Sequence, residues 1–124
     1  MEYIIKKCLK CGAMVRVIKD CTCDNCGIKC CGEEMKEVIP NSVDAAVEKH
    51  VPEYEIKDDK LYVKVNHVMD DDHYIEWISV VFNNKEVVTY LNPGDSAVIH
   101  CKYISGSTIY AYCNKHGLWK KDVE

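Results

Sequence analysis

Apolar and polar side chains alternate along Leu61-Tyr62-Val63-Lys64-Val65-Asn66-His67 and again along His73-Tyr74-Ile75-Glu76-Trp77-Ile78-Ser79-Val80-Val81. A period of two is typical of β-strands, because successive side chains point to opposite faces of a sheet. In the first stretch, the face that begins at Leu61 stays apolar until His67. In the second, His73 opens a face on which we expect Ile75, Trp77 and Val81. The two stretches predict strands joined by a short acidic loop, Asp70-Asp71-Asp72.

Turn signals divide the rest of this region into short strands. Asp58-Asp59, Asn83-Asn84-Lys85 and Asn92-Pro93-Gly94-Asp95 lie between apolar runs and are typical of tight turns. Two further strands are expected near 97–104 and 107–113. Several short antiparallel strands with regular turns predict a β-sandwich.

One short helix is expected before the strands. Ser42 is a suitable N-cap residue for a helix through residues 43–48, and Val51-Pro52 would end it. Pro40 marks a composition change and predicts a boundary between a segment 1–39 and a domain 40–124.

Length, charge and hydropathy limit the class of protein. The chain has 124 residues, 48% of them hydrophobic and 29% charged, which predicts one globular domain, or one domain plus a small satellite. A net charge of −4 argues against nucleic acid as a partner. No apolar run approaches the roughly 18–20 residues of a membrane span. The start of the chain lacks the pattern of a signal peptide, so we expect a cytoplasmic location.

Cysteines are concentrated in the first segment. Seven of the nine lie between Cys8 and Cys31, which indicates metal binding rather than disulfides in a chain without a leader. Four thiolates suit a tetrahedral iron or zinc site. Two ligand sets are open, Cys8/Cys11 with Cys23/Cys26 or Cys8/Cys11 with Cys30/Cys31, and spacing alone slightly favours the first. Since this segment has few large apolar residues, metal binding would supply much of its stability.

Histidines form a second candidate cluster. His67 and His73 lie at the facing ends of two expected strands, His50 ends the expected helix, and His116 follows Cys113 by three residues. His100 differs from these, because alternation places it with Val98 and Lys102 on a solvent-facing side. The opposite side carries Ile99, Cys101 and Tyr103, so Cys101 is expected to be a buried, unreactive thiol.

Six motifs give the sequence a resemblance to a known family. They are Cys-x-x-Cys-Gly at 8–12, Cys-Cys-Gly-Glu-Glu-Met at 30–35, Val-Asp-Ala-Ala-Val-Glu-Lys-His-Val-Pro at 43–52, His67-x5-His73 with Ile75-Glu76-Trp77-Ile78, Leu91-x-Pro93-Gly94-Asp95, and Tyr112-Cys113-Asn114-x-His116-Gly117-x-Trp119. In this order and over essentially the whole chain, the sequence resembles the desulfoferrodoxins, the two-iron class of superoxide reductase.

The resemblance implies a fold and two metal sites. Residues 1–39 would form a desulforedoxin-like domain whose iron is held by Cys8, Cys11, Cys30 and Cys31, with zinc as the other metal that four thiolates accept. Residues 40–124 would form an immunoglobulin-like β-sandwich, in which a catalytic iron takes His50, His67, His73 and His116 as equatorial ligands and Cys113 as the axial thiolate. The insertion between Cys11 and Cys30 departs from the family pattern. Its Cys21, Cys23 and Cys26 would be extra thiols, a redox pair or alternative ligands.

The resemblance also implies a reaction. Superoxide would be reduced by one electron to hydrogen peroxide at the non-haem ferrous centre, in defence against oxidative stress, with electrons from a rubredoxin-like donor. Lys49 would attract the anion and orient a water for protonation, and Glu48 would occupy the sixth position in the resting ferric state. A homodimer is expected. Two other hypotheses remain, a non-enzymatic iron electron-transfer protein and a zinc-ribbon-type binding module.

Overall fold

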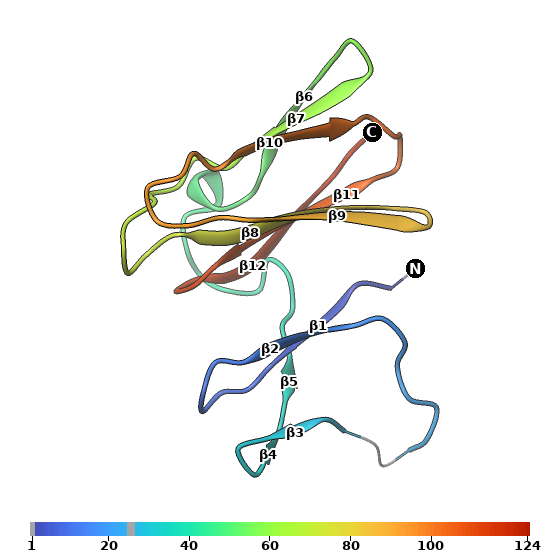
Figure 1. The fold of residues 1–124 in the computed structure, drawn as a ribbon, viewed down its shortest axis with the longest axis vertical. Coiled ribbons are helices and arrows are strands. Elements are labelled where there is room, and N and C mark those ends of the chain that lie inside the picture. Colours follow the sequence, from blue (N-terminus) through green and yellow to red (C-terminus); the bar gives the residue numbers. More distant parts are fainter. Residues whose placement is uncertain (1, 25–26) are drawn as a thin grey trace. The chain divides into compact units, whose positions relative to one another are not determined.

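The computed structural model describes residues 2–24 and 27–124. The chain divides into two compact units, Met1–Ile39 and Pro40–Glu124. Figure 1 shows that both are built from strands. The division falls at Pro40, where the composition of the sequence changes. Each unit is described by itself below.

The first unit contains two small antiparallel sheets. Strands β1 (Ile4–Lys7), β2 (Met14–Val17) and β5 (Lys36–Glu37) pair in the order β2-β1-β5, and β3 (Lys29–Cys30) pairs with β4 (Glu33–Glu34). Its buried apolar side chains among the described residues are Ile4, Ile5, Cys8 and Met35. So small an apolar core gives limited stability without a further cross-link or a metal.

The second unit contains two larger antiparallel sheets. One has the order β10-β7-β6 and the other β12-β11-β8-β9. The bounds of their strands are β6 Glu53–Lys57, β7 Lys60–Lys64, β8 Ile75–Phe82, β9 Lys85–Tyr90, β10 Val98–Lys102, β11 Thr108–Cys113 and β12 Gly117–Asp122.

One apolar core joins these two sheets. Leu61 and Val63 of β7 are in the same buried cluster as Ile78 and Val80 of β8 and Ile109 of β11. Side chains from both sheets therefore pack against each other, as in a sandwich. The predicted fold class, an antiparallel β-sandwich, is confirmed. The alternation predicted for Leu61, Val63 and Val65 is also confirmed, because all three are buried.

The predicted face of β8 is wrong at its first residue. Ile75 lies in the core with Ile78 and Val80, whereas the alternation placed it with Trp77 and Val81. The cause is an irregular register, in which Tyr112 pairs with Trp77 but Cys113 pairs with Ile75. One extra residue on β8 at this bulge reverses the orientation of the side chains that precede it.

The predicted helix over 43–48 is also wrong. The structure has only a short 3₁₀ helix, Val47–Lys49, which begins after Ala46 rather than at Ser42. The residues before it are held to β12 instead, because the Asn41 backbone N–H donates to the Leu118 carbonyl and the Lys120 N–H donates to Asn41 Oδ1. Hydrogen bonds to a strand that is distant in the sequence thus hold Asn41, which lies just before the predicted helix.

The strand ends bring several loops to one end of the second unit. The carboxyl end of β11 and the amino ends of β8 and β12 lie there, as the pairing of Cys113 with both Ile75 and Gly117 requires. The described part of the chain has no helix with the length and apolar character needed to cross a membrane.

Candidate metal centres

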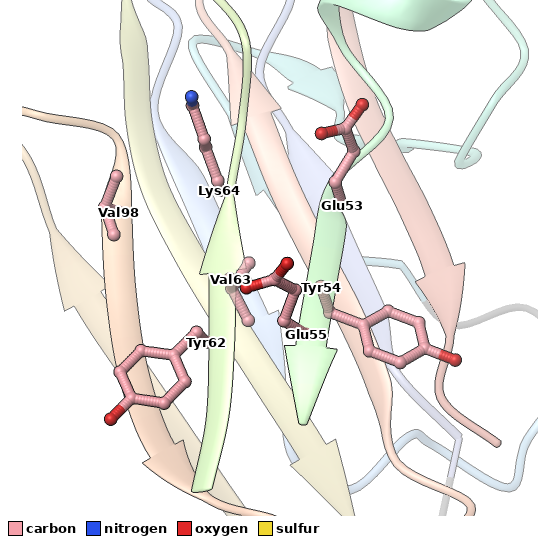
Figure 2. Close-up of a pocket in the computed structure, with 7 residues that line it drawn as sticks. All are labelled: Glu53, Tyr54, Glu55, Tyr62, Val63, Lys64 and Val98. Carbon is pink, nitrogen blue, oxygen red and sulfur yellow. The ribbon is translucent and has the colours of Figure 1, made fainter. Parts of the chain in front are cut away.

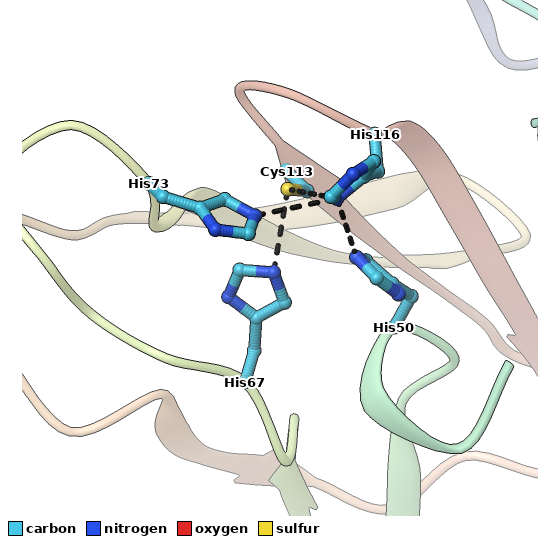
Figure 3. Close-up of side chains that lie close together, drawn as sticks. All are labelled: His50, His67, His73, Cys113 and His116. Atoms are coloured by element: carbon cyan, nitrogen blue, oxygen red, sulfur yellow. Dashed lines mark hydrogen bonds between the residues drawn. The ribbon is translucent and has the colours of Figure 1, made fainter. Parts of the chain in front are cut away.

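Four histidines and one cysteine converge at this end of the second unit (Figure 3). His50 follows the 3₁₀ helix, His67 follows β7, and His73 lies in the turn before β8. Cys113 is the last residue of β11, and His116 belongs to the hairpin that leads into β12. One ligand atom from each side chain lies within 4.8 Å of all the others. Five separate positions in the sequence thus supply one compact donor set.

The four imidazole rings are arranged in a closed cycle. Each ring meets two neighbours edge-to-face, with centroid distances of 4.8 Å for His50–His67, 4.6 Å for His67–His73, 5.0 Å for His73–His116 and 4.8 Å for His116–His50. His50 and His73 are therefore opposite each other, as are His67 and His116. His116 directs Nδ1 inward, 3.1 Å from His50 Nε2 and 3.3 Å from His73 Nε2.

The separations fit a metal ion. With metal–nitrogen bonds of about 2.1 Å, two nitrogens at right angles lie about 3.0 Å apart, close to the two contacts above. The Cys113 sulfur lies 3.3 Å from His67 Nε2 and 3.7 Å from His116 Nδ1, distances that an axial thiolate would show. Imidazole and thiolate donors together suit iron. The donor set and its geometry therefore fit iron binding.

Backbone carbonyls orient two of the imidazoles. His50 Nδ1 is 2.7 Å from the Ala46 carbonyl, and His67 Nδ1 is 2.6 Å from the Val68 carbonyl. A ring whose Nδ1–H donates to a carbonyl keeps Nε2 unprotonated, so its lone pair is available to a metal. Both rings thus have the tautomer that the inward-facing Nε2 needs.

Trp119 contacts two of the candidate ligands. Its ring stacks on His50 at a centroid distance of 4.9 Å, and its Nε1–H donates to the His116 carbonyl at 3.0 Å. Because Trp119 is buried, these contacts restrict both ligands. Trp119 therefore belongs to the packing around the site.

Burial favours the neutral form of His67 and His73. Desolvation is the largest cause that lowers the pKa of His67 and of His73, and the neighbouring imidazoles lower both further. Since a protonated imidazole cannot bind a metal, the lowered pKa values of His67 and His73 favour metal binding by these two side chains near neutral pH.

Lys49 and Glu48 lie just before His50 and are both exposed. Lys49 lines a hollow of about 690 Å³ together with Lys64 and His67. Glu48 lines a different hollow, which contains Val51 and Lys121. In this conformation the lysine, rather than the glutamate, shares a cavity with one of the candidate ligands.

A separate hollow lies on the sheet β10-β7-β6 (Figure 2). Its lining residues are Glu53, Tyr54, Glu55, Tyr62, Val63, Lys64 and Val98. None of these is a histidine or cysteine, so this hollow lacks the donor set of the centre described above.

Four cysteines form a second cluster in the first unit. Cys8, Cys11, Cys30 and Cys31 place their sulfur atoms within 4.8 Å of one another. The Cys11 and Cys30 sulfurs are 3.6 Å apart, and those of Cys30 and Cys31 are 3.9 Å apart. Sulfurs bound tetrahedrally at about 2.3 Å lie about 3.8 Å apart, so the cluster fits iron binding.

The backbone explains how two adjacent cysteines reach one site. Cys31 has φ +55° and Gly32 has φ +77°, both in the left-handed region. This turn lets the side chains of Cys30 and Cys31 face the same point, which two successive residues of an extended strand cannot do. The strain of a left-handed cysteine is a cost that metal binding would offset.

Without a metal, the thiols of Cys8 and Cys30 differ in pKa. The backbone N–H of Cys11, 3.5 Å from the Cys8 sulfur, lowers the pKa of Cys8 to about 6. The neighbouring thiols, Cys11 first, raise the pKa of Cys30 to about 12. A bound cation would have to displace protons from these thiols, so metal binding here should weaken at low pH.

Cys21, Cys23, Cys101 and His100 lie outside both clusters. Cys21 and Cys23 are exposed and not part of the four-thiol group, and Cys26 lies outside the described residues. The set favoured by spacing alone, with Cys23 and Cys26, is therefore not the one that the structure assembles. His100 is exposed, as predicted. Cys101 is only half-buried against the core, and burial raises the pKa of its thiol.

Comparison with known proteins agrees with this geometry. A family model described as desulfoferrodoxin matches residues 42–122. The chain belongs to the desulfoferrodoxin family. It is 38% identical to a protein named desulfoferrodoxin from Syntrophotalea carbinolica, with 95% of this chain and 94% of that protein covered.

Other relatives of this desulfoferrodoxin are named superoxide reductase. A superoxide reductase from Pyrococcus horikoshii is 34% identical, with 73% of this chain and 97% of that protein covered. The crystal structure of a superoxide reductase from Treponema pallidum covers 98% of this chain and 99% of its own, with a TM-score of 0.74 and 24% identity, which shows a shared fold.

Proposed function

We propose that this desulfoferrodoxin is a superoxide reductase whose catalytic iron is held by His50, His67, His73, His116 and Cys113. The observation that carries the proposal is the convergence of four imidazoles and one thiolate on a single point. Relatives named superoxide reductase support it. A ferrous ion held there would supply the electron that, with two protons from solvent, converts superoxide to hydrogen peroxide.

The residues of the chain would contribute to this reaction in different ways. The imidazoles hold the metal without adding charge, and the Cys113 thiolate donates electron density to it from one side. With five donors from the chain, a coordination position would remain open to a small ligand. Because only Cys113 among these donors would be anionic, a site loaded with a ferrous ion would carry a net positive charge that favours the superoxide anion.

Lys49 would guide the substrate and assist protonation. Its side chain lines the hollow that also contains His67, where it adds positive charge and can orient a water toward the bound anion. Glu48 would occupy the sixth position in the resting ferric state, a role that requires it to leave the hollow that it lines here.

The first unit would hold an accessory iron with Cys8, Cys11, Cys30 and Cys31. Zinc is the other metal that a tetrahedral four-thiolate site accepts. Residues 1–39 and 40–124 would then be a desulforedoxin-like domain and a catalytic domain. A rubredoxin-like protein would return one electron to the catalytic iron after each reaction, and two chains would form a homodimer.

The visible spectrum of the air-oxidised protein tests the donor set. We expect a thiolate-to-ferric charge-transfer band of the five-ligand site that is lost in Cys113→Ser, because the Cys113 sulfur is its source, whereas any band of an iron in the four-cysteine site should remain. Cys101→Ser is the matched control, since it removes a sulfur that lies outside the cluster. A colourless protein that contains only zinc after expression in iron-replete medium would exclude the proposal and favour a zinc-ribbon-type module.

A superoxide pulse separates the reductase from an electron carrier. The reduced protein should consume superoxide rapidly and form one hydrogen peroxide for each superoxide, without molecular oxygen as a product. A non-enzymatic electron-transfer protein with the same spectrum would leave the decay of superoxide unchanged.

A further inference from the structure

The side chain of Asn114 joins the two loops that carry His73 and Cys113. The Tyr74 backbone N–H donates to Asn114 Oδ1 at 3.0 Å, and Asn114 Nδ2–H donates to the Asp72 carbonyl at 3.0 Å. The Asn114 backbone N–H donates to the Tyr74 carbonyl at 3.3 Å. Asp72 and Tyr74 are the neighbours of His73, and Asn114 follows Cys113 directly. Asn114 therefore forms hydrogen bonds to the residues on both sides of His73, and it directly follows Cys113 in the sequence.

The position of Asn114, directly after β11, explains why a side chain forms these hydrogen bonds between the two loops. The register between β8 and β11 shifts at their ends, and the last pair is Cys113 with Ile75. The ladder of paired residues between β8 and β11 ends at this pair, although the Asn114 backbone N–H still donates to the Tyr74 carbonyl. An asparagine side chain offers one acceptor and two donors, much as a peptide group offers both kinds of atom. Asn114 thus continues the connection past the irregular end of the ladder, where the ligands lie.

The turn that carries His73 has its own internal pairing. The Asp70 N–H donates to the His73 carbonyl at 2.9 Å, and the His73 N–H donates to the Asp70 carbonyl at 3.3 Å. These bonds shape the turn but do not attach it to the hairpin of Cys113. Lys115 and Asp72 form a contact between the two loops at 3.8 Å, but their side chains are 51% and 85% exposed. An exposed ion pair contributes little to holding the loops.

We propose that Asn114 is a positioning residue that fixes His73 relative to the Cys113 sulfur and so sets the metal affinity of the five-ligand site. The inference rests on the ligand set of the proposed function, but not on the reaction with superoxide. Residues that orient metal ligands by hydrogen bonds commonly change metal affinity by about 10–100-fold when they are replaced.

Titration of the metal-free protein with Co²⁺ tests the proposal. Asn114→Ala should bind Co²⁺ at the five-ligand site about 10–100-fold more weakly than the unmodified protein. Its thiolate-to-cobalt absorption band should also shift, because the placement of His73 relative to the sulfur changes. The band of the four-cysteine site serves as a reference within the same chain and should stay unchanged.

Lys115→Met is the matched control for the second contact between the loops. It removes the ion pair with Asp72 while leaving Asn114 intact, and we expect Co²⁺ affinity to stay within about twofold of the unmodified value, as for an exposed pair. A purely structural role of Asn114 would lower the thermal midpoint of the metal-free variant without moving the cobalt band. That outcome, or an unchanged affinity in Asn114→Ala, would overturn the proposal.

Hydrogen exchange of the unmodified metal-free protein gives a second test that does not depend on a variant folding. The Tyr74 amide should be protected, because it donates to Asn114 Oδ1 before any metal binds. Exchange of this amide at the rate of an unprotected group would overturn the proposal. A protein that binds Co²⁺ as expected but does not reduce superoxide would contradict the proposed function and leave the role of Asn114 intact.

Discussion

Lys49 and Lys64 are the two cations that line the hollow beside His67. The hollow also contains Asp95, but one carboxylate oxygen of Asp95 accepts the Asn92 backbone N–H at 2.8 Å. The chain as a whole carries a net charge of −4, so it repels anions at long range. Local positive charge is therefore needed for rapid encounter with superoxide.

Lys49→Ala should slow the second-order reaction with superoxide by roughly tenfold at low ionic strength and weaken its salt dependence. Rates measured after a superoxide pulse at several salt concentrations test this. Lys60→Ala removes the same charge from an exposed position at the other end of β7 and should leave the rate almost unchanged. Equal rates for Lys49→Ala and the unmodified protein would remove Lys49 from the mechanism.

The histidines make the metal-free protein sensitive to acid. Burial lowers the pKa of His67 and His73 below the ordinary value of 6.5 that they regain on unfolding. Between the lowered pKa and 6.5 the unfolded chain binds more protons, so the free energy of unfolding falls as the pH decreases through this window. As far as these two histidines are concerned, the free energy of unfolding is largest above pH 6.5.

Urea unfolding of the metal-free protein at several pH values measures this effect. The double variant His67→Gln/His73→Gln should show a smaller loss of stability between neutral pH and about pH 5 than the unmodified chain. His100→Gln, at an exposed position of β10, should keep the full pH dependence. A double variant with the same pH dependence as the unmodified protein would contradict the assignment to these two histidines.

At the scale of elements, the strands were predictable and the segment before them was not. Alternation of Leu61, Val63 and Val65 marks β7 because one face of it is buried. The segment 43–48 contains some good helix formers, but it forms no longer helix than the three-residue 3₁₀ helix Val47–Lys49. Asn41 and Val43 contact β12 instead. Contacts to a distant strand leave no mark on local sequence, so they override a weak helix preference.

Some features of the candidate site were likewise predictable from the sequence, and others were not. The resemblance to the desulfoferrodoxins implied five ligands, and the structure brings these five residues together. The carbonyls of Ala46 and Val68 could not be found from the sequence, since every residue has a carbonyl. The bulge that orients Ile75 next to Cys113 was equally invisible, because it depends on the pairing of two strands.

Gly117 is the first residue of β12 and lies close to Val43, which belongs to the segment before His50. Its φ is +81°, and a Cβ at this position would lie 3.1 Å from Val43 Cγ2. The hairpin has three residues between Cys113 and Gly117, a loop length that commonly ends with a left-handed glycine. Both the backbone and the neighbouring valine therefore favour glycine here.

Gly117→Ala should lower the free energy of unfolding by about 1–2 kcal/mol from backbone strain alone, with a further loss from the contact with Val43. Urea unfolding measures the total. Gly106→Ala is the matched control, because Gly106 has φ +84° and a Cβ added there would have no heavy atom within 4 Å. Val43→Ala in the Gly117→Ala background should restore part of the difference, and no restoration would show that the contact is unimportant.

At the scale of the whole molecule, the two units differ in how they are stabilised. The buried cluster of the second unit contains thirteen residues from Leu61 to Val123. The first unit buries only Ile4, Ile5, Cys8 and Met35 among its described apolar residues. The first unit should therefore depend on its metal for folding, whereas the second should keep its fold when its own metal is absent.

Cys11→Ser/Cys31→Ser should separate the two units experimentally. Loss of two of four thiolates should abolish metal binding in the first unit and make residues 1–39 sensitive to proteases, because few apolar contacts remain to hold them. The thiolate band of the Cys113 centre should persist, since its five donors all lie in residues 40–124. Cys23→Ser, outside the four-thiol cluster, should keep both metals. Simultaneous loss of both metal bands in the double variant would show instead that the units fold as one, and metal analysis with limited proteolysis distinguishes these outcomes.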